Sequence, residues 1–300
     1  MSHPGWQELT LETSQPHVEA LEDWLFAHGA VAVTLEDNAD EPLLEPGPGE
    51  TPLWQQVKVV ALFDEGVNLQ PVIHGVPADL IEAPPSAPAH VPDQDWERAW
   101  MDNFHPMRMG ERLWICPSWQ EPPEPDAVNI ILDPGLAFGT GTHPTTALCL
   151  GELDKQVKPG MRVIDFGCGT GILAIAALKL GAGHAWGVDN DPQAIIASRQ
   201  NAERNQIGAA QFGVSLPDDV DWAGLNQSAD IVVANILAGP LHVLAPQLKS
   251  LLKPGGQLIL AGLLADQAAD LVAEYAPEVT LSIACEKEGW ALLSGRCSVG

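Results

Sequence analysis

Basic residues are scarce in this sequence, and their scarcity is greatest near its start. Only 14 lysines and arginines accompany 40 aspartates and glutamates, which gives a formal net charge of −26. Residues 1–85 contain fifteen acidic side chains and one lysine, Lys58. Such a segment repels nucleic-acid phosphates and attracts a basic protein, although acidity can also serve solubility alone. We therefore expect a basic protein partner and no direct nucleic-acid binding.

Paired cysteines and long apolar runs are also missing. The sequence has five cysteines, at positions 116, 149, 168, 285 and 297. They are odd in number, scattered and never in a CxxC pair, so we expect no disulfide framework and no metal site. No window reaches the roughly 18 apolar residues of a membrane span. The start, MSHPGWQELTLETS, has neither the basic flank nor the apolar run of a secretory signal, so we expect a cytoplasmic protein.

The length of 300 residues and a hydrophobic content of 46% indicate two folded domains. In residues 1–85 the pattern alternates between strand and helix in the order β-α-β-β-α-β. The expected strands cover 7–13, 30–37, 57–63 and 79–83, and the expected helices cover 16–30 and 65–75. This order predicts a small α+β, ferredoxin-like domain, a fold that often serves recognition but does not by itself define a function.

A proline-rich break separates this domain from the rest, and we assign residues 86–126 to an interdomain linker. Trp96 and Trp100 are four residues apart, which predicts a short helix in the linker. Three arginines also fall here, Arg98, Arg108 and Arg112. They can tether the acidic domain or pack within the linker, and packing is the simpler interpretation.

Residues 127–300 alternate strand-like and helical segments. The strands are expected at 161–167, 184–189, 210–216, 229–237 and 255–264, with helices at 171–180, 192–205, 240–252 and 266–275. Such alternation predicts an α/β domain with a doubly wound parallel sheet. Two further strand-like runs surround EKEG near the end without an intervening helix, which predicts a terminal hairpin, one antiparallel strand and seven strands in all.

The first strand of this domain runs into a glycine-rich turn, VIDFGCGTG. Gly167, Gly169 and Gly171 allow the backbone to bend and to approach a ligand closely. Asp189 ends the next strand, 22 residues after Gly167, where its carboxylate can accept the hydroxyls of an adenosine ribose. The context of strand, turn, apolar helix, strand and acid favours a nucleoside cofactor over a merely structural turn.

The glycine spacing is G-x-G-x-G, whereas the dinucleotide fingerprint is G-x-G-x-x-G/A, so a nicotinamide dehydrogenase is disfavoured. Asp165 stands just before the turn. A carboxylate there is unfavourable beside a diphosphate but can orient the ammonium of an amino-acid moiety, as in S-adenosylmethionine. Alternatively, Asp165 only accepts hydrogen bonds from amides of the turn.

VIDFGCGTG and GVDND resemble motifs of the class I S-adenosylmethionine-dependent methyltransferases, whose catalytic domain is Rossmann-like. LDPGLAFGTGTHPTT and VVANILAGPL resemble, more narrowly, the PrmA family, which methylates large-subunit ribosomal protein eleven. The resemblance covers the whole chain. It implies a front domain that recognises the protein substrate, a linker that lets the domains swing, and a back domain that binds S-adenosylmethionine and releases S-adenosylhomocysteine.

The resemblance also implies roles for single residues. Thr146, Gly167, Asp189 and Asn235 are expected to contact the cofactor. Gly169, Asp165 and Phe138 complete the expected cofactor site. Asn235 carries most weight for the chemistry, because a carbonyl at the end of a strand can orient an acceptor amine. No general base is assigned.

His143-Pro144-Thr145-Thr146 reads as a helix start whose hydroxyls are available for capping.

Asn235 is not followed by the Pro-Pro-aromatic signature of enzymes that methylate amide or base nitrogens, which disfavours those acceptors. As the resemblance implies, we expect a methyltransferase acting on lysine ε-amines, and on the N-terminal amine, of a basic ribosomal protein, and we expect it to be a monomer. The alternatives are another protein or small-molecule acceptor, or a protein that binds the cofactor without catalysis.

Overall fold

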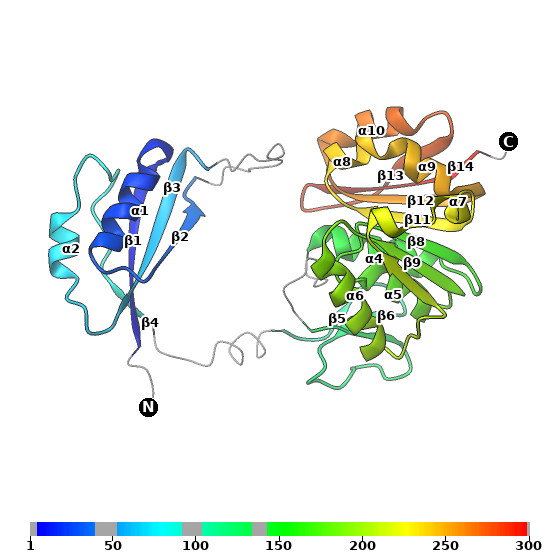
Figure 1. Cartoon of the computed structure of the whole chain (residues 1–300), viewed down its shortest axis with the longest axis horizontal. Helices are drawn as coiled ribbons and strands as arrows, with labels where there is room; N and C mark the ends of the chain where they lie inside the picture. Colours follow the sequence, from blue (N-terminus) through cyan, green and yellow to red (C-terminus); the bar gives the residue numbers. More distant parts are fainter. Residues whose placement is uncertain (1–4, 40–52, 92–103, 134–142, 299–300) are drawn as a thin grey trace. The chain divides into compact units, whose positions relative to one another are not determined.

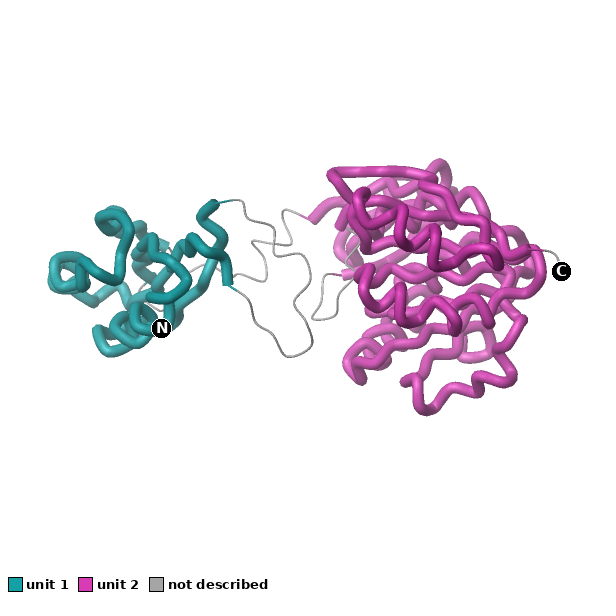
Figure 2. Tube along the Cα trace, turned by 90° about the horizontal axis from the view of Figure 1, so that it is seen from above, with its two compact units in different colours: residues 1–103 teal, residues 104–300 magenta. Residues whose placement is uncertain are grey.

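The computed structural model describes residues 5–39, 53–91, 104–133 and 143–298. The chain forms two compact units, residues 1–103 and 104–300 (Figure 2). Within the described ranges, no helix is both long enough and apolar enough to cross a membrane.

Unit 1 is a four-stranded antiparallel sheet covered by two helices (Figure 1). Its elements are β1 (Trp6–Ser14), α1 (Val18–Ala27), β2 (Ala32–Asp37), β3 (Gln56–Asp64), α2 (Gln70–Gly75) and β4 (Ala89–Val91). The strands lie in the order β2-β3-β1-β4. Burial alternates along β3, so one face of the sheet packs on α1, which buries Val18, Leu21 and Leu25. The order of elements confirms the predicted β-α-β-β-α-β pattern.

The last strand of unit 1 lies later in the chain than predicted. Residues 79–83 are not a strand, because a turn begins at Pro77, where the amide of Leu80 donates to the Pro77 carbonyl (3.0 Å). The segment reaches β1 through the amide of Glu82, which donates to the carbonyl of Glu12 (2.8 Å). The fourth strand is β4, antiparallel to β1. The front sheet therefore extends past residue 85, into the segment that we assigned to the linker.

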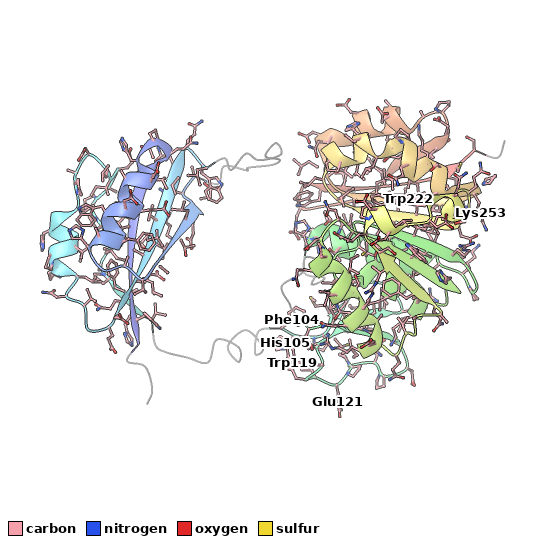
Figure 3. All side chains as sticks on the ribbon, viewed as in Figure 1. Phe104, His105, Trp119, Glu121, Trp222 and Lys253 are labelled. Atoms are coloured by element: carbon pink, nitrogen blue, oxygen red, sulfur yellow. The ribbon has the colours of Figure 1, made fainter. Side chains whose placement is uncertain are left out.

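From residue 104 onward, the expected linker belongs to unit 2. Residues 104–131 hold a three-stranded sheet of β5 (Met107–Arg108), β6 (Leu113–Cys116) and β7 (Val128–Ile131). Phe104 packs near Trp119 at this end of the unit, with ring centroids 6.3 Å apart (Figure 3). The helix expected around Trp96 and Trp100, and Arg98 with it, lie outside the described residues.

The other two linker arginines are used for packing inside unit 2. Arg112 Nε donates to Oδ1 of Asp154 (2.9 Å), a nearly buried residue of α4 (Pro144–Gln156). Arg108 Nη2 donates to the carbonyl of Glu111 (2.7 Å) and its guanidinium lies over the ring of Trp114. These contacts favour the packing interpretation over a tether to the acidic domain.

The seven-stranded sheet of unit 2 has the order β10-β9-β8-β11-β12-β14-β13 (Figure 1). In chain order its strands are β8 (Arg162–Phe166), β9 (His184–Val188), β10 (Phe212–Ser215), β11 (Ala229–Asn235), β12 (Leu252–Leu264), β13 (Val279–Lys287) and β14 (Trp290–Cys297). The pairs are parallel up to β12, and β14 runs antiparallel to both of its neighbours. The predicted seven strands and terminal hairpin are confirmed.

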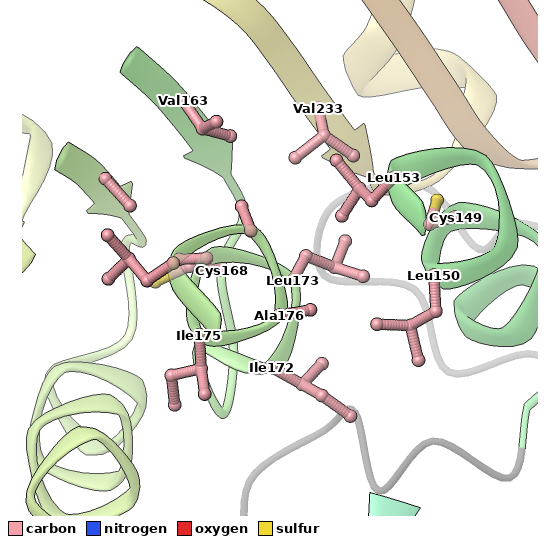
Figure 4. Close-up of a cluster of buried hydrophobic side chains, with 14 of the residues drawn as sticks. Cys149, Leu150, Leu153, Val163, Cys168, Ile172, Leu173, Ile175, Ala176 and Val233 are labelled. Atoms are coloured by element: carbon pink, nitrogen blue, oxygen red, sulfur yellow. The ribbon is translucent and has the colours of Figure 1, made fainter. Parts of the chain in front are cut away.

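Helices cover both faces of this sheet and enclose two cores. The helices of unit 2 that follow α4 are α5 (Ile172–Lys179), α6 (Pro192–Arg204), α7 (Trp222–Leu225), α8 (Ala238–Val243), α9 (Ala245–Leu251) and α10 (Ala268–Tyr275). Successive residues of β11 serve opposite cores: Ile231 and Val233 pack with α4 and α5, whereas Val232 packs with α8, α9 and α10. Figure 4 shows Val233 beside Leu173 of α5 and Leu153 of α4.

The helix expected over 240–252 is two helices, α8 and α9. Pro246 is the cause: proline has no amide hydrogen to donate, and its ring clashes with the carbonyl four residues earlier. It is tolerated in the first turn of α9, which begins at Ala245.

Candidate cofactor and acceptor site

The glycine turn joins the carboxyl end of β8 to α5. Gly167, Gly169 and Gly171 all have positive φ, at 75°, 53° and 76°, which side chains rarely adopt. A Cβ on Gly167 would also collide with Cγ2 of Ile236, which follows β11. The amide of Gly167 donates to the carbonyl of Val188 (2.7 Å) and so ties the turn to β9. The turn therefore has the tight geometry that the sequence predicts.

Asp189 comes directly after β9 and contacts this turn. Its Oδ2 accepts a hydrogen bond from the amide of Gly169 (2.8 Å), and its Oδ1 accepts one from the amide of Asp191 (3.0 Å). An ionised carboxylate has about four acceptor positions. Two remain for hydroxyl groups of a ligand, and the side chain is only partly buried.

One face of α6 holds the turn from behind, which the sequence analysis missed. Ser198 Oγ donates to the carbonyl of Gly169 (2.9 Å), and Asn201 Nδ2 donates to the carbonyl of Thr170 (3.0 Å). Both side chains are buried. The available signal was the spacing of hydrogen-bonding residues three and four apart, which places them on one helix face.

Asn205, directly after α6, continues this face. Its amide oxygen accepts from the backbone amide of Ile131, and its Nδ2 donates to the Ile131 carbonyl, both at 2.8 Å. The side chain thus pairs with the end of β7 in the way that a neighbouring strand would. It fixes the three-stranded sheet against the helix that holds the glycine turn.

Asn235 and Thr146, two residues implied by the resemblance, meet in the structure. Asn235 ends β11, and its Nδ2 donates to Oγ1 of Thr146 in the first turn of α4 (3.2 Å). They are 89 residues apart in the sequence. Because Thr146 is only 1% exposed, it gives Asn235 a fixed support. This hydrogen bond does not use the amide oxygen of Asn235, which remains an acceptor.

The cap of α4 differs from our expectation. The N-cap is His143, whose Nδ1 accepts from the amide of Thr145 (3.3 Å) and lies 2.7 Å from its hydroxyl. The threonine hydroxyls are not the caps, because the imidazole nitrogen already occupies that position. Burial lowers the pKa of His143, which favours the neutral ring that can accept these bonds. The ring also meets the indole of Trp290 edge to face, with centroids 5.0 Å apart.

Asp165, in β8, is fully buried. Its Oδ2 accepts from the amide of Ala174 in α5 (3.0 Å), and its Oδ1 has no hydrogen-bond partner among the described residues. Burial raises the pKa of Asp165 to about 7, the Ala174 amide opposes the shift, and the charge of Asp189 adds to it. The donating amide belongs to the helix rather than to the turn. Phe138, the last residue assigned to this site, lies outside the described residues.

These residues lie where an open parallel sheet receives ligands. Strand order reverses between β8 and β11, because the chain goes from β8 to β9 and β10 on one side and returns to β11 on the other. Gly167, Asp189 and Asn235 all follow or end strands at this reversal, which is the usual ligand site of such sheets. A close backbone turn and a part-buried carboxylate fit the ribose end of an adenosine-containing cofactor.

The family described as ribosomal protein L11 methyltransferase (PrmA) matches residues 5–298. The chain belongs to this family. Proteins named ribosomal protein L11 methyltransferase from Shewanella amazonensis and Pseudomonas paraeruginosa are 50% and 53% identical to it, over 97% of this chain and 98% of each relative. The ribosomal protein L11 methylase structure from Lactobacillus delbrueckii subsp. bulgaricus has 34% identity and a TM-score of 0.56, over 65% of this chain and 100% of that one.

The protein is therefore an enzyme, an S-adenosylmethionine-dependent methyltransferase of the PrmA family. The predicted Rossmann-like fold and the predicted cofactor are confirmed, and a dehydrogenase is set aside. The residues of the site described above are compatible with that cofactor in their chemistry and their place on the sheet.

The buried carboxyl of Asp165 yields a pH prediction. Its pKa is higher in the folded chain than in the unfolded one, so the folded state binds more protons between about pH 4 and 7, and stability falls as pH rises through that window. Asp165→Asn removes this titration. We expect the difference in unfolding free energy, variant minus wild type, to increase as pH rises from 4 to 7. The increase should be at most about 1.4 kcal/mol per pH unit.

Urea unfolding of both proteins at several pH values measures this difference. Asp266→Asn, at an exposed position, is the control and should show no such trend. A difference between Asp165→Asn and wild type that stays constant from pH 4 to 7 would contradict the prediction.

Proposed function

We propose that this enzyme transfers methyl groups from S-adenosylmethionine to lysine ε-amines, and to the N-terminal α-amine, of ribosomal protein L11. The observation that carries the proposal is the Asn235–Thr146 pair at the carboxyl end of β11, beside the glycine turn. The amide oxygen of Asn235 can accept a hydrogen bond from the N–H of an acceptor amine. The names of the relatives support L11 as the protein substrate.

The contribution of the protein to the reaction is orientation. The bound cofactor supplies an electrophilic methyl group. Asn235 holds the acceptor nitrogen through its amide oxygen, and Thr146 keeps the amide from rotating. Fixing the acceptor in line with the methyl group lowers the barrier, because the entropy of orienting the two groups is lost on binding and not in the chemical step.

The acceptor nitrogen must be neutral to react. A lysine ammonium has a reference pKa of about 10.4, whereas an α-amine has one of about 7.7–8.0, so lysine must lose its proton at greater cost. Removing the amine from water on binding lowers its pKa. We assign no side chain as the base and propose that water accepts the proton.

For the cofactor we propose contacts to the residues that the motifs single out. Asp189 would accept hydrogen bonds from the ribose hydroxyls. The backbone of the turn at Gly167 and Gly169 would lie close to the cofactor. Thr146 and Asn235 would face the reacting end. Asp165 and Phe138 complete the proposed set, with Asp165 acting from beneath the turn, where its carboxylate accepts from α5.

The front segment is proposed to recognise the substrate. Its charge supports this role, since residues 1–85 carry fifteen acidic residues and one lysine, and a basic ribosomal protein has the complementary sign. We propose a recognition domain made of 1–85 together with β4, and a catalytic domain made of 127–300 together with the sheet of β5, β6 and β7, which leaves a shorter linker than the expected 86–126. A monomer in the cytoplasm, acting on L11 free or in the ribosome without contacting nucleic acid, completes the proposal.

Intact-mass spectrometry tests the proposed function. Purified L11 is incubated with the full chain and S-adenosylmethionine, and with an equally basic ribosomal protein as the competing acceptor. We expect additions of about 14 Da, the mass of a transferred methyl group, on L11 alone. Peptide mapping then places them on lysines and the first residue. Methylation of the other protein and not of L11 would contradict the proposed substrate and indicate a different protein acceptor.

The proposed ribose contact predicts the effect of Asp189→Ala. Loss of hydrogen bonds to a charged acceptor costs about 1.5–3 kcal/mol, so the affinity for S-adenosylhomocysteine should fall roughly 10- to 100-fold. Isothermal titration calorimetry measures the affinity, and Glu203→Ala on the exposed side of α6 is the control. Unchanged affinity in Asp189→Ala would remove Asp189 from the cofactor site.

The proposed role of Asn235 predicts a different pattern. Asn235→Ala leaves the acceptor amine unoriented, so kcat should fall roughly 100-fold, the scale of a misplaced reacting group. The affinity for S-adenosylhomocysteine should change much less. Steady-state kinetics and calorimetry on the same preparation compare the two losses, and equal losses would make Asn235 a cofactor-binding residue only.

A further inference from the structure

The hairpin of β13 and β14 brings its turn to the edge of the sheet that carries the site. Glu288 and Gly289 connect the two strands, and the amide of Ala265 donates to the carbonyl of Gly289 (3.0 Å). Asn235 of β11 pairs with Ala261 of β12. Trp290 of β14 pairs with Leu264, which is three residues further along β12. The turn thus lies beyond Asn235 along the strand direction, two strands across the sheet and past an irregularity of β12 at Gly262.

Ring contacts connect this turn to the acceptor pair. The indole of Trp290, the first residue of β14, packs against the imidazole of His143, with centroids 5.0 Å apart and planes at 69°. His143 caps α4, and Thr146 in its first turn holds Asn235. The charge of Glu288 reaches the same ring, since it raises the pKa of His143 against the effect of burial.

Glu288 occupies a position that suits other residues better. Its φ is +53° and that of Gly289 is +81°, as in the two-residue hairpin turns that favour asparagine, aspartate or glycine at the first position. Its side chain is 65% exposed, and it forms an ion pair with the adjacent Lys287, whose Nζ lies 3.8 Å from Oε1. The turn therefore displays a carboxylate to solvent at the edge of the site.

We propose that Glu288 is a specificity-determining residue that attracts the alkylammonium of a substrate lysine, while Trp290 provides an apolar wall for its methylene chain. The inference rests on the proposed function. A lysine side chain arrives protonated, because its reference pKa is about 10.4. A carboxylate beside the site favours its binding but takes no part in the transfer. Neutral acceptors would gain nothing from it.

Substitutions at Glu288 separate charge from turn conformation. Glu288→Gln keeps the length and the unfavourable φ and removes only the charge. Glu288→Asp and Glu288→Asn both suit the turn, and they differ from each other only in charge. Each full-length variant is compared with wild type for methylation of L11, with KM and kcat measured at low and at physiological ionic strength.

We expect the Gln and Asn variants to raise KM for L11 about two- to fivefold at low salt, the scale of one exposed charge, with kcat nearly unchanged. The Asp variant should keep the KM of the wild type. Physiological salt should shrink the difference, because it screens exposed charges. Both Glu288→Asn and Glu288→Asp should unfold at a slightly higher temperature than wild type. Weaker binding of L11 by Glu288→Asn would therefore not be an effect of lower stability.

Glu278→Gln is the matched control. It removes the same charge directly before β13, at the other end of that strand, together with an ion pair to Nζ of Lys249 (3.2 Å). An equal rise in KM in this control, or unchanged KM in the Gln and Asn variants, would overturn the role of Glu288 and leave the proposed function intact. No methylation of L11 by the wild type would overturn the proposed function, and the role of Glu288 with it.

Discussion

The site depends on a backbone turn that is bonded on several sides. Its glycines take positive φ, and its groups are already committed: the Gly169 amide to Asp189, the Gly169 carbonyl to Ser198, and the Thr170 carbonyl to Asn201. The end of β9 and helix α6 thereby fix one short loop. Since ligand binding is strongest when the site needs no reordering, this pre-organised turn is the part of the fold on which cofactor binding rests.

Carboxylates take four different roles in unit 2, and their surroundings decide which. Asp154 is nearly buried and pairs with Arg112, so it serves packing. Asp165 is buried without such a partner, which raises its pKa. Asp189 is half-buried and bound by amides, so it keeps acceptor positions for a ligand. Glu288 stands in solvent beside the site, where its charge acts at a distance. Composition alone reports only the large negative charge of the chain.

Two expected elements differ in the structure, each for a reason that the apolar pattern alone does not show. A short amphipathic segment can become a strand only if a free strand edge is available to it. Residues 79–83 have the right pattern, but a turn at Pro77 redirects them, and β4 takes the edge of β1 instead. Similarly, Pro246 ends a helix that periodicity alone would continue. For Arg108 and Arg112 the preferred packing interpretation is supported, but no local pattern reveals that their partners lie within unit 2.

The sequence by itself determined the parts that local chemistry controls: the alternation of strands and helices, the need for glycine at the turn, and the acid that follows the next strand. These features depend on hydrophobic period and on backbone conformations open to few residues. Only the tertiary structure decided that Thr146 supports Asn235, that α6 holds the turn, and that Trp290 meets His143. Those contacts join residues tens of positions apart, and their partners are chosen by how the sheet and its layers pack rather than by any neighbour in the chain.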